Sequence, residues 1–228
     1  MLMTNTNNWQ NYEGFVLAAR DAGTAGKKLT LLTKEVGRIF VFAPQARRKA
    51  NYIGYLVPAA FLRCTVAADT EGYRLLQADG RALTDTWQWT YPMWQVYYFL
   101  VHMTEELFAS GQADAQVYHL WEQYLTALSR KDLAIATLIA SWQLLGIAGY
   151  DPQTVLQEKQ FLPLSDTGRQ TLFAILHATW QDGPQLFSRQ GLTEAADALL
   201  YYLTNYVEIA TQFTNVFTFA QKSIDNKI

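Results

Sequence analysis

The residues best suited to chemistry in this sequence are three consecutive cations, Arg47, Arg48 and Lys49, which form its densest basic run. Two tyrosines, Tyr52 and Tyr55, follow shortly after them. Because cations neutralise phosphates and aromatic rings stack on bases, this combination favours holding a nucleic-acid strand without reading its sequence. The alternative interpretation is a solvated loop whose tyrosines are half-buried.

Further cations lie on apolar segments that precede this run. Lys27 and Lys28 open one segment, and since side chains alternate along a strand, only one of the two can face outward. Arg38 opens the next segment, on the opposite strand face from Ile39, and is a reasonable phosphate contact. The candidate DNA-binding residues are Lys27, Lys34, Arg38, Arg47, Arg48, Lys49 and Tyr52.

Patterns typical of enzymes are missing from the sequence. His102 with Glu105 and His119 with Glu122 share helix faces at i and i+3, but di-iron bundles use the reverse order and need further carboxylates. Neither a Gly-rich nucleotide fingerprint, nor a Gly-x-Ser-x-Gly elbow, nor a His-Glu-x-x-His motif occurs. We therefore expect no enzymatic activity, no bound metal and no cofactor.

The composition is that of a folded protein in a reducing compartment. With 50% hydrophobic and 17% charged residues, the chain is too apolar for disorder. Its one cysteine, Cys64, excludes an intrachain disulfide and a thiolate zinc site. The first ten residues lack the basic and apolar regions of a secretory signal, so we expect a cytoplasmic protein.

Two long stretches without a formal charge, Thr86–Thr104 and Leu133–Tyr150, approach the length of a membrane span. Pro92 and His102 interrupt the first stretch, and polar residues together with Gly149 interrupt the second. We therefore expect buried helices of a water-soluble core rather than membrane contact.

The charge is unevenly distributed along the chain, although the formal net charge is only −2. Residues 1–80 carry ten basic and six acidic side chains, a net charge of +4, whereas residues 81–228 carry eight and fourteen, a net charge of −6. Such asymmetry places any nucleic-acid contact in the first segment.

The hydrophobic period changes near residue 80, which predicts two domains, residues 1–80 and 81–228. Before this point Gly-punctuated apolar runs predict five strands, with Cys64 on the core face of the fourth and Gly37 turning the second into the third. These strands are expected at Gly14–Ala19, Lys27–Thr33, Arg38–Ala43, Phe61–Ala67 and Tyr73–Ala78. Five strands in about 80 residues suit a small closed barrel.

After residue 84 apolar residues recur at helical spacing, which predicts an all-helical second domain. Helices are expected at Val96–Phe108, Val117–Leu128, Leu133–Leu145, Thr167–Trp180 and Thr193–Phe219. Breaks are expected at 149–152 and 182–184, where Gly and Pro occur together. The predicted fold class is therefore α+β, mainly α by residue count.

Three segments of the first domain resemble the DNA repair protein RecO family of bacterial recombination mediators. They are Gly14-Phe15-Val16-Leu17-Ala18-Ala19-Arg20, then Leu29-Thr30-Leu31-Leu32-Thr33-Lys34-Glu35-Val36-Gly37-Arg38-Ile39, then Ala46-Arg47-Arg48-Lys49. In that family they form the first strand, the second strand with its hairpin, and a basic loop of an OB-fold. A looser helical match runs through Leu144-Leu145-Gly146 and Gly149-Tyr150-Asp151-Pro152.

The resemblance implies a mediator that binds single- and double-stranded DNA and anneals complementary strands. It also implies partners: RecR, the single-stranded DNA-binding protein and, indirectly, RecA. The chain departs from many members in having no four-cysteine zinc finger after residue 152 and no basic residue in Thr211–Phe217. A protein-interaction adaptor of the same family that has lost DNA binding is the alternative, favoured by the −6 helical segment.

The family binds the acidic, apolar-ended tail of the single-stranded DNA-binding protein on its helical domain. Such a peptide needs an apolar slot with a cation at its rim. Arg130 and Lys131 form the only adjacent basic pair after residue 81, which makes them the candidate rim. The alternative is that the pair only complements the C-terminus of the preceding helix.

Overall fold

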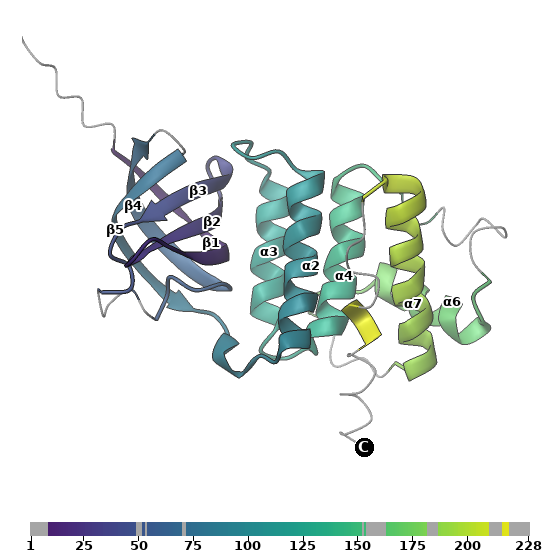
Figure 1. The fold of residues 1–228 in the computed structure, drawn as a ribbon. Coiled ribbons are helices and arrows are strands. Elements are labelled where there is room, and N and C mark those ends of the chain that lie inside the picture. The colour runs from purple at the N-terminus through teal and green to yellow at the C-terminus, as the bar shows by residue number, and fades with distance from the viewer. Residues whose placement is uncertain are drawn as a thin grey trace, which may run out of the picture. The chain divides into compact units, whose positions relative to one another are not determined.

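The computed structural model describes residues 9–48, 52, 54–69, 72–151, 153, 163–181, 187–209 and 216–218. The chain divides into two compact units, one of Met1–Trp87 with Ala109–Glu122 and one of Gln88–Phe108 with Gln123–Ile228. The first holds every described strand, and the second holds most of the helices (Figure 1). The fold is therefore α+β, as the change of hydrophobic period predicts.

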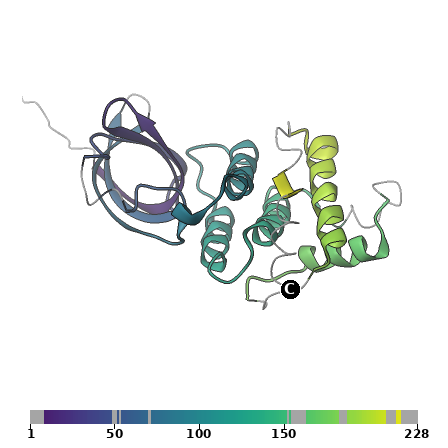
Figure 2. The same cartoon turned by 60° about the horizontal axis from the view of Figure 1, so that its bottom comes forward.

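Five strands close into a barrel, and Figure 2 shows the ring that they form. They are β1 (Trp9–Ala22), β2 (Gly26–Thr33), β3 (Gly37–Ala43), β4 (Ala60–Asp69) and β5 (Gly72–Ala82). The spatial order is β1-β2-β3-β5-β4, and only the β3–β5 pair is parallel. This arrangement is the OB-fold barrel, so the five predicted strands and the barrel are confirmed.

Strict alternation along β3 shows how the sequence fills the barrel. Ile39, Val41 and Ala43 are buried in the barrel core, whereas Phe40 and its neighbours in the alternating positions face outward. Cys64 of β4 is buried in the same core, as its alternating neighbours predict. Burial raises the pKa of its thiol to about 11, so this cysteine contributes packing rather than chemistry.

The β2–β3 hairpin turns at Gly37, whose φ of 69° confirms the positive angle predicted for it. The Thr33 hydroxyl donates a hydrogen bond to the Gly37 carbonyl at 2.8 Å and braces this turn. Residues 109–122 return to the barrel at the same place, because the Gly111 amide donates to the Arg38 carbonyl at 2.8 Å. The Tyr118 ring also packs against Phe15 of β1.

The other regular elements of the described chain are helices. They are α2 (Tyr91–Leu107), α3 (Ala115–Ala127), α4 (Leu133–Ile147), α6 (Asp166–Leu176) and α7 (Arg189–Tyr202). Short turns of other helix types are η1 (Thr86–Gln88), η2 (Leu203–Val207) and η3 (Val216–Thr218). The first three predicted helices are confirmed, and the fourth is confirmed except that it ends at Leu176 instead of Trp180. Within the second unit α2 packs against α4, and α6 packs against α7.

The helix predicted over Thr193–Phe219 is wrong in its second half. After Tyr202 the chain widens into a π-helical turn and then leaves the helix at Glu208, which has a φ of 58°. The side chains of Thr204 and Asn205 donate to main-chain carbonyls one turn earlier and compete with the regular helical pattern. Residues 210–215 and 219 lie outside the described residues.

The two uncharged stretches behave differently. Leu133–Tyr150 is buried along nearly all of α4, as predicted, and Trp142 is its largest buried side chain. In the stretch Thr86–Thr104 the prediction fails at the beginning, where Trp87 is 80% exposed and Tyr91 is 74% exposed. Among the described residues, no helix combines the length and the apolar character that crossing a bilayer requires.

Candidate nucleic-acid interface

Lys27 serves the barrel rather than its outer surface. The lysine sits at the start of β2 with its side chain on the inward row, where its Nζ donates a hydrogen bond to the Leu56 carbonyl at 3.0 Å. The neighbouring Lys28 is exposed on the outer row. Because side chains alternate along a strand, only one of the two lysines was predicted to point outward. That lysine is Lys28, whereas Lys27 was the predicted DNA-binding candidate.

Arg47 is engaged in holding the β1–β2 turn. Its guanidinium donates to Asp21 Oδ2 at 3.0 Å and to the Gly23 carbonyl at 2.8 Å. Its main-chain amide donates to the Ala25 carbonyl at 3.0 Å. Because the Asp21 carboxylate already neutralises this charge, Arg47 attracts a phosphate less strongly than an arginine without an ion pair does.

The two tyrosines beside the basic run belong to the barrel core. Tyr52 is only 8% exposed, which corrects its prediction as a base-stacking residue, since a base cannot reach either face of a buried ring. Tyr55 packs edge-on against Tyr52, and its hydroxyl donates to the Ala78 carbonyl at 2.9 Å. Burial raises the pKa of Tyr55. The packing of both rings therefore favours the alternative interpretation of this segment, in which the tyrosines belong to the fold and do not stack on bases.

The remaining basic candidates lie at separate places on the barrel. Lys34 is exposed in the β2–β3 turn, and Arg48 is exposed in the turn after β3. Arg38 opens β3 on its outer face and is half-buried. Lys49 lies outside the described residues. The structure does not gather the predicted set into one cluster.

The outer face of β2 and β3 also carries residues that are not among the predicted candidates. Phe40 is 47% exposed on the outer face of β3, and Phe42 lies two residues further along the same face. The Phe42 ring packs over Gly26 of β2, which leaves no space for a side chain at that position. Lys28 is the direct neighbour of Phe42 across the β2–β3 ladder. Alternation from the buried Ile39 could have placed both phenylalanines outward.

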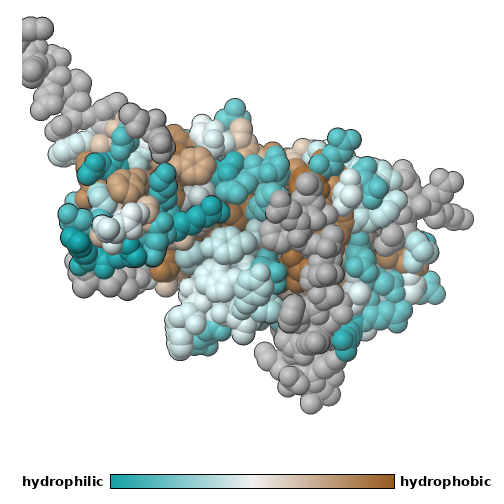
Figure 3. Space-filling model, viewed as in Figure 1, coloured by the Kyte–Doolittle hydropathy of each residue, from teal (hydrophilic) through white to brown (hydrophobic). Residues whose placement is uncertain are grey.

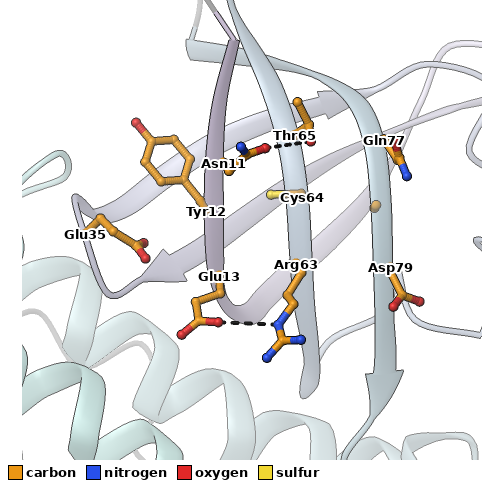
Figure 4. Close-up of a pocket in the computed structure, with 10 residues that line it drawn as sticks. Asn11, Tyr12, Glu13, Glu35, Arg63, Cys64, Thr65, Gln77 and Asp79 are labelled. Carbon is orange, nitrogen blue, oxygen red and sulfur yellow. Dashed lines mark hydrogen bonds and ion pairs between the residues drawn. The ribbon is translucent and has the colours of Figure 1, made fainter.

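The opposite wall of the barrel carries a pocket of about 410 Å³ with acidic character (Figure 4). Glu13 of β1, Glu35 of the β2–β3 turn and Asp79 of β5 line it. Its one cation, Arg63, forms an ion pair with Glu13 at 3.5 Å. With three carboxylates against one arginine, this wall repels phosphates.

The pocket contains no activated nucleophile. Burial raises the pKa of Tyr12 to about 12, assisted by its hydroxyl contact with Tyr73. The thiol of Cys64 in the same pocket has its pKa raised in the same way, so both groups are protonated at neutral pH. Among the residues that the structure describes, no three His, Cys, Asp or Glu side chains come together as a metal site.

Arg130 and Lys131 lie in the turn that follows α3. Their main-chain amides both donate to the Ala127 carbonyl at 2.8 Å and close the end of that helix. Arg130 is exposed and Lys131 is half-buried. This position suits a cation that complements a helix C-terminus, which is the alternative interpretation of the pair.

Neither a comparison with models of protein families nor one with curated proteins finds a match for this chain. The OB-fold barrel carries cations and aromatic rings on the outer face of β2 and β3, and carboxylates around the pocket.

Proposed function

We propose that the protein binds single-stranded DNA on the outer face of β2 and β3 and brings complementary strands together, in the manner of a RecO-type recombination mediator. The observation that carries the proposal is the exposed ring of Phe40 between Arg38 and Phe42 on the outer face of β3, together with Lys28 next to Phe42 on β2. OB-folds bind oligonucleotides on this face, and an aromatic ring among cations suits an unstacked base with its phosphates.

Charge around the barrel supports this choice of face. The visible surface of the barrel is mainly hydrophilic with hydrophobic residues among its polar ones (Figure 3). The acidic wall with Glu13, Glu35 and Asp79 disfavours a strand on the opposite side. Binding through phosphates and ring faces leaves base edges free to pair, which is what annealing requires.

The wider role rests on the family resemblance of the first domain. By that resemblance the protein acts on single- and double-stranded DNA, works with RecR and the single-stranded DNA-binding protein, and assists RecA indirectly. Sequence-independent binding fits this role, because a mediator must accept any strand that repair exposes.

Titration of a fluorescent oligo-dT with the full chain tests the proposal between about 50 and 200 mM salt. We expect salt-dependent binding that Phe40→Ala weakens by about 1–3 kcal/mol, the contribution of one stacked base. The matched control is Phe173→Ala, because Phe173 is a similarly exposed phenylalanine on α6. Absence of binding at the lowest salt, or equal loss in both variants, contradicts the proposal.

A second candidate function is the protein-interaction adaptor without DNA binding. The exposed Trp87 and Tyr91 favour it, since Trp and Tyr are enriched in protein interfaces. A chain that fails to bind oligo-dT but binds a RecR or single-stranded DNA-binding protein partner supports the adaptor. If Tyr91→Ala also loses binding of this protein partner, and neither the unaltered chain nor the variant binds oligo-dT, the adaptor is distinguished from the mediator.

A further inference from the structure

We infer that the single strand crosses the barrel along one row of four residues, Arg20, Lys28, Phe42 and Arg74, and we assign Arg20 and Arg74 as phosphate contacts. This inference rests on the proposed function and specifies the path of the DNA strand along these four residues, which we call the track. It extends the binding face from β2 and β3 onto β1 and β5.

The register of the barrel places the four residues side by side. Arg20 of β1 pairs with Lys28 of β2, and Lys28 pairs with Phe42 of β3. Phe42 in turn pairs with Arg74 of β5 in the short parallel ladder. Each step is one strand spacing of about 4.8 Å, so the row spans roughly 14 Å.

All four side chains lie on the outer surface of the barrel. Arg20, Lys28 and Arg74 are exposed and Phe42 is half-exposed. Their neighbours in the alternating positions point inward: Leu29, Val41 and Leu75 are buried in the barrel core. The row is therefore a continuous outward ridge with a ring between cations.

The spacing suits a single strand better than a compact anion. A span of roughly 14 Å equals the advance of about four nucleotides at the duplex rise of about 3.4 Å per nucleotide of one strand. Arg20 and Arg74 at the two ends therefore reach different phosphates, while Phe42 between them lies beneath a base.

The two terminal arginines also differ from Arg47 and Arg63 in their partners. Arg47 pairs with Asp21, and Arg63 pairs with Glu13. Arg20 and Arg74 take part in no ion pair among the described residues. Among the described residues, a phosphate therefore meets no carboxylate paired with these two guanidinium groups.

The test measures the salt dependence of oligo-dT binding by the full chain and by Arg20→Gln, Arg74→Gln and the double variant. Each phosphate contact on a single strand contributes about 0.7 to the slope of log K against log salt. We therefore expect slopes lower by about 0.7 for each single variant and about 1.4 for the double variant. Arg81→Gln is the matched control, since Arg81 is an exposed arginine near the far end of β5.

The outcomes separate the track from the proposed function. Unchanged slopes in all arginine variants, with binding still weakened by Phe40→Ala, overturn the track and leave the proposed function standing. An equal decrease for Arg81→Gln also overturns the track, because the effect is then one of net charge. Absence of oligo-dT binding by the unaltered chain overturns both. Unaltered thermal unfolding of each variant confirms that the fold is intact.

Discussion

Gly37 shows how closely one residue fixes the β2–β3 turn. Its φ is positive, and a Cβ atom at this position would overlap the backbone carbonyl group of Gln112. We expect Gly37→Ala to lower the free energy of unfolding by about 3 kcal/mol, because backbone strain of about 1–3 kcal/mol adds to the displacement of the Gln112 segment. Urea denaturation of both proteins measures the difference.

Gly23 provides the matched control for this prediction. It also has a positive φ, of 59°, but nothing lies within 4 Å of the position that its Cβ would take. Gly23→Ala should therefore cost only about 1 kcal/mol, the price of the backbone angle alone. Equal costs at the two glycines would show that the Gln112 contact contributes nothing.

Because of Cys64, the stability of the barrel should fall as the pH rises in the alkaline range. Burial raises the pKa of its thiol from 9.0 to about 11, so the folded state holds the proton more tightly than the unfolded chain. The stabilisation is complete below pH 9 and is lost as the pH rises from 9 to about 11, and its full size is about 3 kcal/mol. Cys64→Ala should flatten that decline in urea denaturation series at pH 8 and pH 10.5. A decline of the same steepness in the variant contradicts this assignment.

At the scale of an element, α4 depends on the cap at its beginning. Asp132 Oδ1 accepts hydrogen bonds from the amides of Ala134 at 2.9 Å and Ile135 at 3.4 Å. We expect Asp132→Ala to destabilise the protein by about 1 kcal/mol, whereas Asp132→Asn retains an acceptor and costs little. Thermal unfolding checks both, and an equal loss in the two variants would point to the charge rather than the cap.

Sequence periodicity could predict elements and the faces of each strand, but not which strands are neighbours. Alternation with Leu62 and Val66 was enough to predict that Cys64 is buried, and alternation from Ile39 could have shown that Phe40 points outward. The row from Arg20 to Arg74 depends on β3 pairing with β5, a long-range contact that no local pattern encodes. The prediction for Tyr52 has a related weakness, because the sequence around this tyrosine has no clear period that shows whether the ring points inward.

At the scale of the whole molecule, the first compact unit is assembled from two separate parts of the chain. The barrel accounts for Met1–Trp87, and Ala109–Glu122 returns to it after α2. The change of hydrophobic period marks where strands stop, near residue 80, and it carries no information about a later segment that packs back on the barrel. Unit boundaries therefore follow packing rather than period.

A fragment of residues 1–87 should accordingly be less stable than the same barrel in the full chain. It lacks Tyr118, which packs on Phe15 with ring centroids 5.1 Å apart, and Gly111, whose amide donates to the Arg38 carbonyl. Exposing one large apolar side chain costs about 1.5–3 kcal/mol, and the lost hydrogen bond adds about 1 kcal/mol. Urea denaturation followed by circular dichroism should give the fragment a clearly lower midpoint.

Tyr118→Ala in the full chain is the control for this prediction. It removes the ring contact and keeps the Gly111 hydrogen bond, so it should destabilise the barrel by less than the truncation does. A fragment that unfolds at the midpoint of the full-length barrel would show that residues 109–122 rest on the barrel without stabilising it.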